Sequence, residues 1–169
     1  MNAEGLSAGG LSVPSFTQVT TVYPAEELAA QVLRRGQHLR IKARGGSMLP
    51  FIWDGDVALV TPAAPTSIAI GDVVCYETTP GRLFLHRIIR RDGDRFVTKG
   101  DALSSTEVIE PTQLLGKVVG IERRGGISRL DTRAGRWRNR AAVCVSRVVP
   151  RLLPLALRLR RGLRAALHG

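Results

Sequence analysis

Cysteine and aromatic residues are both scarce in this chain of 169 residues. Its two cysteines, Cys75 and Cys144, cannot build a disulfide framework and have no metal-ligand spacing. We interpret both as small apolar residues of the fold. Aromatic residues make up 5% of the chain and form no cluster, so a domain that binds nucleic acid by base stacking is disfavoured.

Long hydrophobic runs are also missing. The longest charge-free apolar stretch near the C-terminus covers residues 152–157, far short of the roughly 20 residues that cross a bilayer. The first 22 residues lack the basic and continuous apolar segments of a secretory signal, and they are rich in Gly, Ser, Thr and Ala. We therefore predict a disordered leader over 1–22 and a protein that is cytoplasmic or bound peripherally to a membrane.

Positive charge is present but unevenly distributed. Residues 1–122 carry 12 Lys or Arg against 13 Asp or Glu, whereas residues 123–169 carry 13 Arg against one Asp. This predicts a nearly neutral domain over 23–122 followed by an Arg-rich tail over 123–169. Leucines of the tail fall on one side of a helical wheel and arginines on the other, so we expect a basic amphipathic helix.

Such a helix can lie in a membrane interface, with its leucines buried and its arginines on anionic headgroups. Residues 151–167 are therefore a candidate for contact with an anionic membrane surface. A solvated basic tail, or a helix packed on the core, explains the same pattern.

The rest of the chain predicts a mainly β, antiparallel domain. A short helix is expected from Pro24 to Gly36, because Pro and two acidic residues favour a helix start and Gly favours its end. Alternating and β-branched runs then predict strands at 38–43, 56–61, 72–77, 83–90, 95–99 and 113–122. The Asp-Gly pair within 91–94 predicts a tight hairpin.

The segment Gly45-Gly46-Ser47-Met48-Leu49-Pro50 is the candidate centre of chemistry. A serine after two glycines is typical of a nucleophile on a tight turn that a substrate backbone can approach. Serine needs a base, and His86 lies in an apolar strand; Asp101 and Glu107 could orient its ring. Each residue alone is better explained as a turn or core residue.

Five blocks in order make the pattern more specific. They are Gly-Ser47-Met-Leu-Pro, Gly55-Asp56-Val57, Gly71-Asp72-Val73-Val74, His86-Arg87-Ile88 and Lys99-Gly100-Asp101-Ala102. Together they resemble the type I signal peptidase family over roughly residues 38–121. The resemblance is to the branch found in archaea and the endoplasmic reticulum, in which histidine replaces the lysine of most bacterial members.

The resemblance implies a signal-peptidase-like β-core and acyl transfer without a cofactor or metal. Ser47 would be the nucleophile and His86 the general base, with either Asp101 or Glu107 orienting the histidine. The remaining implied site residues form the oxyanion hole or the substrate groove: Gly45, Gly46, Met48 and Pro50. The implied substrates are leader or signal peptides of other proteins, cut after small residues at the −1 and −3 positions.

Four alternatives remain open. An inactive scaffold that retains the fold is less well supported, because Ser47, His86 and Asp101 are all present. Self-cleaving repressors use a related β-core with a Ser-Lys pair and a DNA-binding module, but no helix-turn-helix fits before residue 38. A dedicated maturation protease for small peptides would use the same chemistry on another substrate. A non-enzymatic β-barrel that binds nucleic acid through its basic tail is less well supported, because residues 1–122 are not basic.

Overall fold

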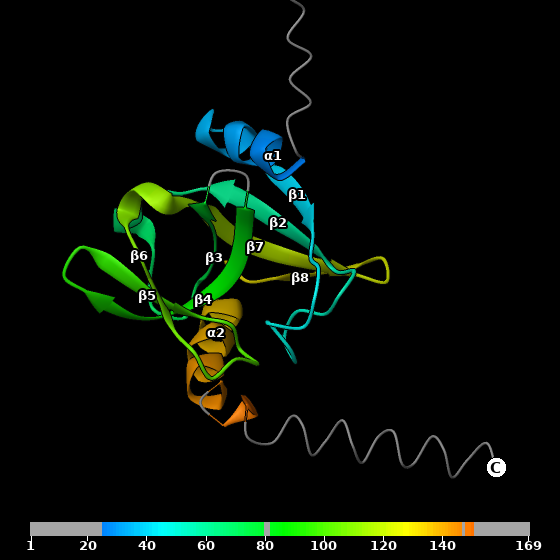
Figure 1. Cartoon of the computed structure of the whole chain (residues 1–169). Helices are drawn as coiled ribbons and strands as arrows, with labels where there is room; N and C mark the ends of the chain where they lie inside the picture. The colour runs from blue at the N-terminus through cyan, green and yellow to red at the C-terminus, as the bar shows by residue number, and fades with distance from the viewer. Residues whose placement is uncertain (1–24, 80–81, 147, 151–169) are drawn as a thin grey trace, which may run out of the picture.

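The computed structural model describes residues 25–79, 82–146 and 148–150. Helix α1 (Ala25–Arg34) lies at one end of the β-structure and helix α2 (Arg133–Val145) at the other (Figure 1). The strands are β1 (Leu39–Lys42), β2 (Val57–Pro62), β3 (Val73–Thr79), β4 (Arg82–Asp92), β5 (Arg95–Lys99), β6 (Glu107–Ile109), β7 (Leu114–Arg123) and β8 (Gly126–Arg129). Two short 3-10 helices, Pro65–Ser67 and Pro111–Gln113, connect strands.

All eight described strands belong to one antiparallel sheet. The sequence predicted the antiparallel arrangement and six of these strands. The order is β1-β2-β7-β3-β4-β5-β6, and β8 pairs separately with β7. Within the described residues, strand β1 is therefore an edge strand that pairs only with β2. Strand β4 is long enough to pair with β3 along its first half and with β5 along its second half. Among the described strands, the first half of β4 therefore borders β3 and the second half borders β5, each along one edge.

The local sequence signals predict the main elements correctly. Helix α1 begins directly after Pro24, carries Glu26 and Glu27 in its first turn, and ends before Gly36, whose φ is +79°. The six predicted strands correspond to β1, β2, β3, β4, β5 and β7. The hairpin between β4 and β5 turns at Gly93 with a φ of +60°, a conformation that costs glycine little.

The sequence did not predict β6, β8 or the position of α2. Residues 133–145 form a helix that their Arg-rich composition did not indicate. Its N-cap is Thr132, whose side chain accepts a hydrogen bond from the Gly135 N–H at 3.0 Å. The folded unit therefore continues past residue 122, where the charge changes. The predicted leader over 1–22 and the Leu-Arg stripe of 151–167 lie outside the described residues.

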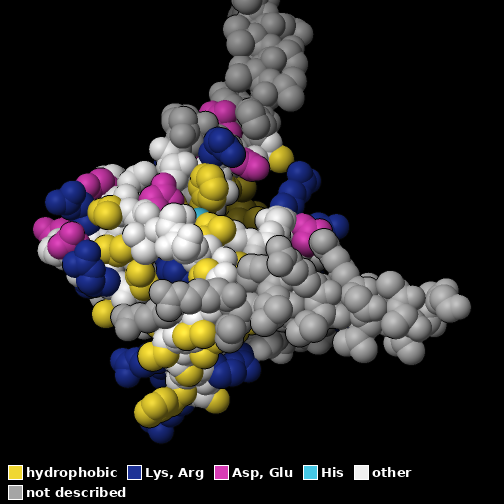
Figure 2. Space-filling model, turned by 60° about the horizontal axis from the view of Figure 1, so that its bottom comes forward, with side chains coloured by type: hydrophobic (Ala, Val, Ile, Leu, Met, Phe, Trp, Pro, Cys, Tyr) yellow, Lys and Arg dark blue, Asp and Glu magenta, His cyan; other side chains and the backbone are white. Residues whose placement is uncertain are grey.

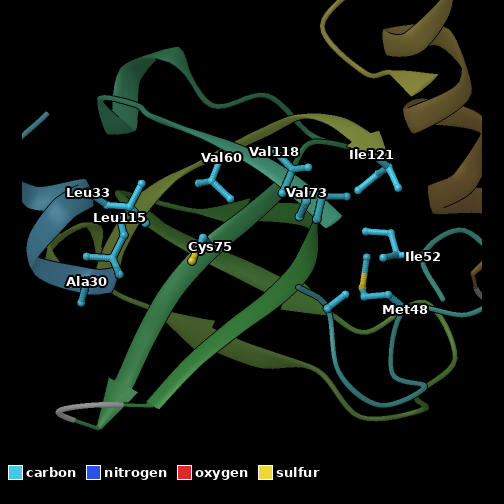
Figure 3. Packing of buried hydrophobic residues seen from close by; sticks show 12 residues of the cluster. Ala30, Leu33, Met48, Ile52, Val60, Val73, Cys75, Leu115, Val118 and Ile121 are labelled. Atoms are coloured by element: carbon cyan, nitrogen blue, oxygen red, sulfur yellow. The ribbon is translucent and has the colours of Figure 1, made fainter. Parts of the chain in front are cut away.

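The core has two buried clusters on either side of the sheet's central strands. The larger cluster runs from Ala30 and Leu33 of α1 at one end to Met48 and Ile52 at the other (Figure 3). Met48 directly follows the candidate nucleophile, so core packing fixes the position of that turn. Among the described helices, none is long and apolar enough to cross a bilayer.

Candidate active site

Ser47 lies in the loop between β1 and β2, on a turn held from both sides. Gly45 has a φ of +80°, and its N–H donates to Asp54 Oδ1 at 2.8 Å. The Met48 carbonyl accepts from the N–H groups of Phe51 and Ile52, each at 3.0 Å. Within the described residues, the Ser47 backbone N–H and side-chain hydroxyl have no hydrogen-bond acceptor or donor of their own. Both groups are therefore available to a bound molecule.

A second loop, residues 100–103, holds the backbone of Ser47 in place. The Ser47 carbonyl accepts a hydrogen bond from the Ala102 N–H at 2.9 Å. A Cβ atom on Gly100 would lie 2.8 Å from the same carbonyl oxygen and 2.9 Å from Leu103, closer than real Cβ contacts occur. The Lys-Gly-Asp block thus needs a glycine because the backbone of the candidate nucleophile passes directly against it.

Ser47 and His86 line the same cavity, which has a volume of about 640 Å³. We call this cavity the groove. Helix α1, strand β1 with the following residues 43–45, and the first half of β4 form its walls, and its lining is mostly apolar. No hydrogen bond joins Ser47 to His86 among the described groups; catalytic hydrogen bonds commonly tighten only in the substrate complex.

His86 is connected to a carboxylate through Tyr76. His86 Nδ1 lies 2.8 Å from the Tyr76 hydroxyl, and that hydroxyl lies 2.6 Å from Glu107 Oε2. Thr98 Oγ1 is 3.4 Å from the same hydroxyl and 3.2 Å from the Glu107 carbonyl. The register explains the proximity: Val74 pairs with His86, and Tyr76 lies two residues further along the same face.

This chain of contacts defines which ring nitrogen of His86 carries the proton. Tyrosine has one hydroxyl proton, and an ionised carboxylate can only accept. The Tyr76 hydroxyl therefore donates to Glu107, and its oxygen accepts from Nδ1–H of His86. The Nε2 lone pair of His86 is then free to act as a base.

Burial favours the neutral form of both the His86 ring and the Tyr76 hydroxyl. It lowers the pKa of His86 below its usual value of 6.5, while the charges of Glu107 and Asp101 oppose that change. Burial, reinforced by the hydrogen bond to Glu107, raises the pKa of the Tyr76 hydroxyl well above 10. At neutral pH the ring of His86 is therefore an unprotonated base beside a protonated tyrosine.

Asp101 interacts with Arg87 instead of His86. Both oxygens of its carboxylate accept from the guanidinium, at 2.8 and 2.7 Å, and both side chains are buried. The same guanidinium donates to the Gly71 carbonyl at 2.9 Å and lies 3.4 Å from Oδ1 of Asn139 on α2. Of the two carboxylates that could orient His86, only Glu107 reaches it, and it does so through Tyr76.

The other predicted groove residues divide into two groups. Gly45 and Met48 line the groove together with Ser47, and Met48 also belongs to the buried core. Gly46 and Pro50 do not line it; Gly46 lies against Leu49, and the carbonyl of Pro50 accepts from the indole N–H of Trp53. These two residues shape the turn.

A Ser-Lys pair has no support from Lys99, the lysine that belongs to the Lys-Gly-Asp block. Its ammonium group is buried and donates to the Ser146 carbonyl at the end of α2. In the described part of the chain, no group of three or more His, Cys, Asp or Glu side chains could hold a metal ion.

Tyr76 and Arg87 were not predicted from the sequence. Tyr76 lies in the apolar run of β3 and looks like an ordinary core residue. The sequence did contain one indication of its role. The other buried residues of this strand are apolar, and a buried tyrosine hydroxyl needs a hydrogen-bond partner.

Comparison with protein families shows which family the chain belongs to. The model of the Peptidase S24-like family matches residues 6–119, which include Ser47, His86 and both carboxylates. The chain belongs to the Peptidase S24-like family. A comparison with curated protein sequences gives no significant match.

Membership of the Peptidase S24-like family supports the serine peptidase class and agrees with the mainly antiparallel β fold. The superfamily includes both self-cleaving repressors and signal peptidases, so membership does not separate these relatives. The finer assignment to the histidine branch of type I signal peptidases depends on His86 and goes beyond family membership.

Proposed function

We propose that this S24-like peptidase is a serine endopeptidase that cleaves extended leader or signal peptides, with Ser47 as nucleophile and His86 as general base. One observation carries the proposal. Ser47 and His86 line one groove, and the Tyr76–Glu107 pair directs the free lone pair of His86 to Nε2. A free hydroxyl and a neutral, oriented imidazole are the two groups that acyl transfer requires.

The proposed reaction has two steps. The Ser47 oxygen attacks the scissile carbonyl while His86 Nε2 takes the hydroxyl proton, and the imidazolium then gives that proton to the leaving amine. Water, activated by the same nitrogen, next releases the acyl group from Ser47. The Ser47 N–H, which has no acceptor among the described residues, is the proposed oxyanion donor.

Extended substrates are favoured by the strand edges beside the groove. Among the described strands, none pairs with the outer side of β1, and residues 83–86 of β4 pair only with β3. Both edges line the groove. A peptide in extended form can hydrogen-bond to such an edge as an added strand, which places its backbone beside Ser47.

A direct test compares the wild-type protein with Ser47→Ala on an extended peptide containing an Ala-X-Ala site. Mass spectrometry identifies the products. Cleavage after the second Ala that is absent with Ser47→Ala supports the proposal. Absence of cleavage by a folded wild-type protein, over a panel of extended peptides, contradicts it.

We further propose that α2 brings the protein to an anionic membrane surface together with the tail. Trp137 on this helix is 75% exposed, and Arg133, Arg136 and Arg140 flank it without any acidic residue in the helix. At the end of the molecule that carries α2, hydrophobic side chains are flanked by basic ones (Figure 2). An exposed tryptophan among arginines fits the headgroup region of a bilayer.

A further inference from the structure

A row of basic side chains runs along the edge of the groove. Residues Arg40, Lys42 and Arg44 alternate with Leu39, Ile41 and Ala43, so that the first set is exposed and the second faces the core. All six line the groove. The row is distinctive because residues 1–122 as a whole carry slightly more acidic than basic residues.

Two of these basic side chains have no acidic partner among the described residues. Arg40 pairs with Glu122 of β7, but no ion pair involves Lys42 or Arg44. Among the described residues that line the groove, Glu26 of α1 is the only acidic one, and its carboxylate accepts the Leu83 N–H at 3.3 Å. The positive charge beside Ser47 is therefore not neutralised within the described structure.

The backbone of the same residues faces the open edge of β1. The Ala43 N–H donates to the Asp56 carbonyl at 2.7 Å, and the Ala43 carbonyl accepts from Gly55 at 3.0 Å. In an antiparallel pair, residues bonded to the partner strand alternate with residues whose backbone groups point away from it. Lys42 and Arg44 thus offer both their backbone groups and their charges to a strand added at this edge.

Below the row, the floor of the groove is apolar. Leu39 and Ile41 of β1, Leu83 and Leu85 of β4, and Ala29 of α1 contribute to it. Side chains of an added strand alternate between the floor and the outer face, and those on the outer face become cross-strand neighbours of Lys42 and Arg44.

We infer that the groove selects an extended peptide in which acidic side chains alternate with apolar ones. The acidic residues face Lys42 and Arg44, and the apolar residues lie on the floor. This inference rests on the proposed peptidase function and specifies its substrate class. A peptide is favoured over a nucleic acid because the groove presents strand edges and few aromatic rings.

The test measures binding and cleavage separately. Fluorescein-labelled extended peptides with one Ala-X-Ala site carry Glu, Gln or Lys at two alternating positions, which are scanned along the peptide. Binding is followed by anisotropy with Ser47→Ala, and cleavage with the wild-type protein. The best Glu peptide should bind about tenfold more tightly than its Gln counterpart, and the difference should shrink in high salt.

Charge reversal provides the matched test on the protein side. The double variant Lys42→Glu/Arg44→Glu should prefer the Lys peptide over the Glu peptide. Arg90→Glu/Arg95→Glu, an equal change in net charge at two exposed residues of β4 and β5 that do not line the groove, should keep the wild-type preference. Comparison of the three peptides on the wild-type protein decides the question even where the double variant does not fold.

Each outcome has a distinct meaning. Equal binding and cleavage of the Glu, Gln and Lys peptides overturns the acidic-substrate inference and leaves the peptidase function intact. Displacement of the bound Glu peptide by a single-stranded oligonucleotide of higher affinity also overturns it, in favour of nucleic acid. Absence of both binding and cleavage for every peptide contradicts the peptidase proposal itself.

Discussion

The Tyr76 hydroxyl bridges His86 Nδ1 and Glu107, at 2.8 Å and 2.6 Å respectively. The tyrosine therefore occupies the position between histidine and carboxylate that a direct hydrogen bond fills in a Ser-His-Asp triad. In the proposed mechanism, this hydroxyl fixes the orientation of the His86 ring and the tautomer with the proton on Nδ1. Tyr76 is then a positioning residue, and it does not need to touch the substrate.

Replacement of this hydroxyl tests the bridge. Tyr76→Phe should lower kcat/KM by about 10- to 100-fold, part of the roughly 10²- to 10⁴-fold that general-base catalysis contributes. Glu107→Gln should act through the same contact, so the double variant should lose little more activity than either single variant. The ¹⁵N chemical shifts of His86 should report loss of the Nδ1–H tautomer in Tyr76→Phe. Additive losses with an unchanged tautomer would falsify the positioning role.

Activity should depend on the protonation of His86. Burial lowers the pKa of His86 below 6.5, so the neutral base is present at pH 7 and is lost as pH falls through that lowered value. A plot of kcat/KM against pH should therefore have its acidic limb below pH 6.5. An acidic limb centred above pH 7 would contradict this assignment of the base.

The same pKa shift affects stability in a defined direction. The unfolded chain binds a proton at His86 more readily than the folded chain does, because only the folded chain buries the ring. The contribution of His86 to the free energy of unfolding should therefore fall as pH drops below about 6.5. Urea titrations at several pH values measure this effect, and His86→Gln should reduce the slope over that range.

Loss of Asp101 should chiefly reduce stability. Asp101→Ala leaves the buried guanidinium of Arg87 without its carboxylate, which should cost about 3–5 kcal/mol of unfolding free energy. Urea denaturation measures this cost. Asp131→Ala, which removes a partly exposed carboxylate paired with Arg129, should cost less than about 1 kcal/mol. Similar costs for the two variants would contradict the structural role of Asp101.

The clamp on the Ser47 peptide should be sensitive to one added methyl group. Gly100→Ala places a Cβ atom 2.8 Å from the Ser47 carbonyl oxygen, so the turn must move. Since displacement of a reacting group by about 1 Å can cost 10²-fold, kcat should fall by about that factor. Gly126→Ala is the matched control, because its Cβ would come no closer than 3.7 Å to other atoms. Equal activity of both variants would show that the turn tolerates the displacement.

Membrane attachment through α2 can be measured by flotation with vesicles of anionic phospholipid. Trp137→Ala should reduce the bound fraction, and high salt should reduce it further. Trp53→Ala, which removes a half-exposed tryptophan near the Ser47 turn, should not. Equal flotation of both variants, or none by the wild-type protein, would rule out α2 as the contact.

Most of the fold could be predicted from the sequence because its signals are local. Alternating residues, the Asp-Gly hairpin at Gly93 and the Pro and Gly limits of α1 each act within a few residues. Ser47 and His86 could be singled out only through the five ordered blocks, and the structure places both in one groove. Strand β6 has only three residues, too few for a periodic signal.

The connections between site residues could not be predicted, because they depend on strand register. Tyr76 meets His86 only because Val74 is paired with that histidine, and Glu107 joins them only because it is paired with Thr98. Asp101 and Glu107 were equally plausible orienting groups in the sequence. Their difference arises from Arg87, which follows His86 in β4 and takes up the carboxylate of Asp101.

The basic row on β1 has a consequence for the protein at high concentration. An open strand edge above an apolar floor is a site at which two copies of a chain can join, the first step toward aggregation. If two copies approached edge to edge, Lys42 and Arg44 of one would meet the same cations of the other. The charges that are proposed to admit an acidic peptide would thus also oppose edge-to-edge pairing of two copies.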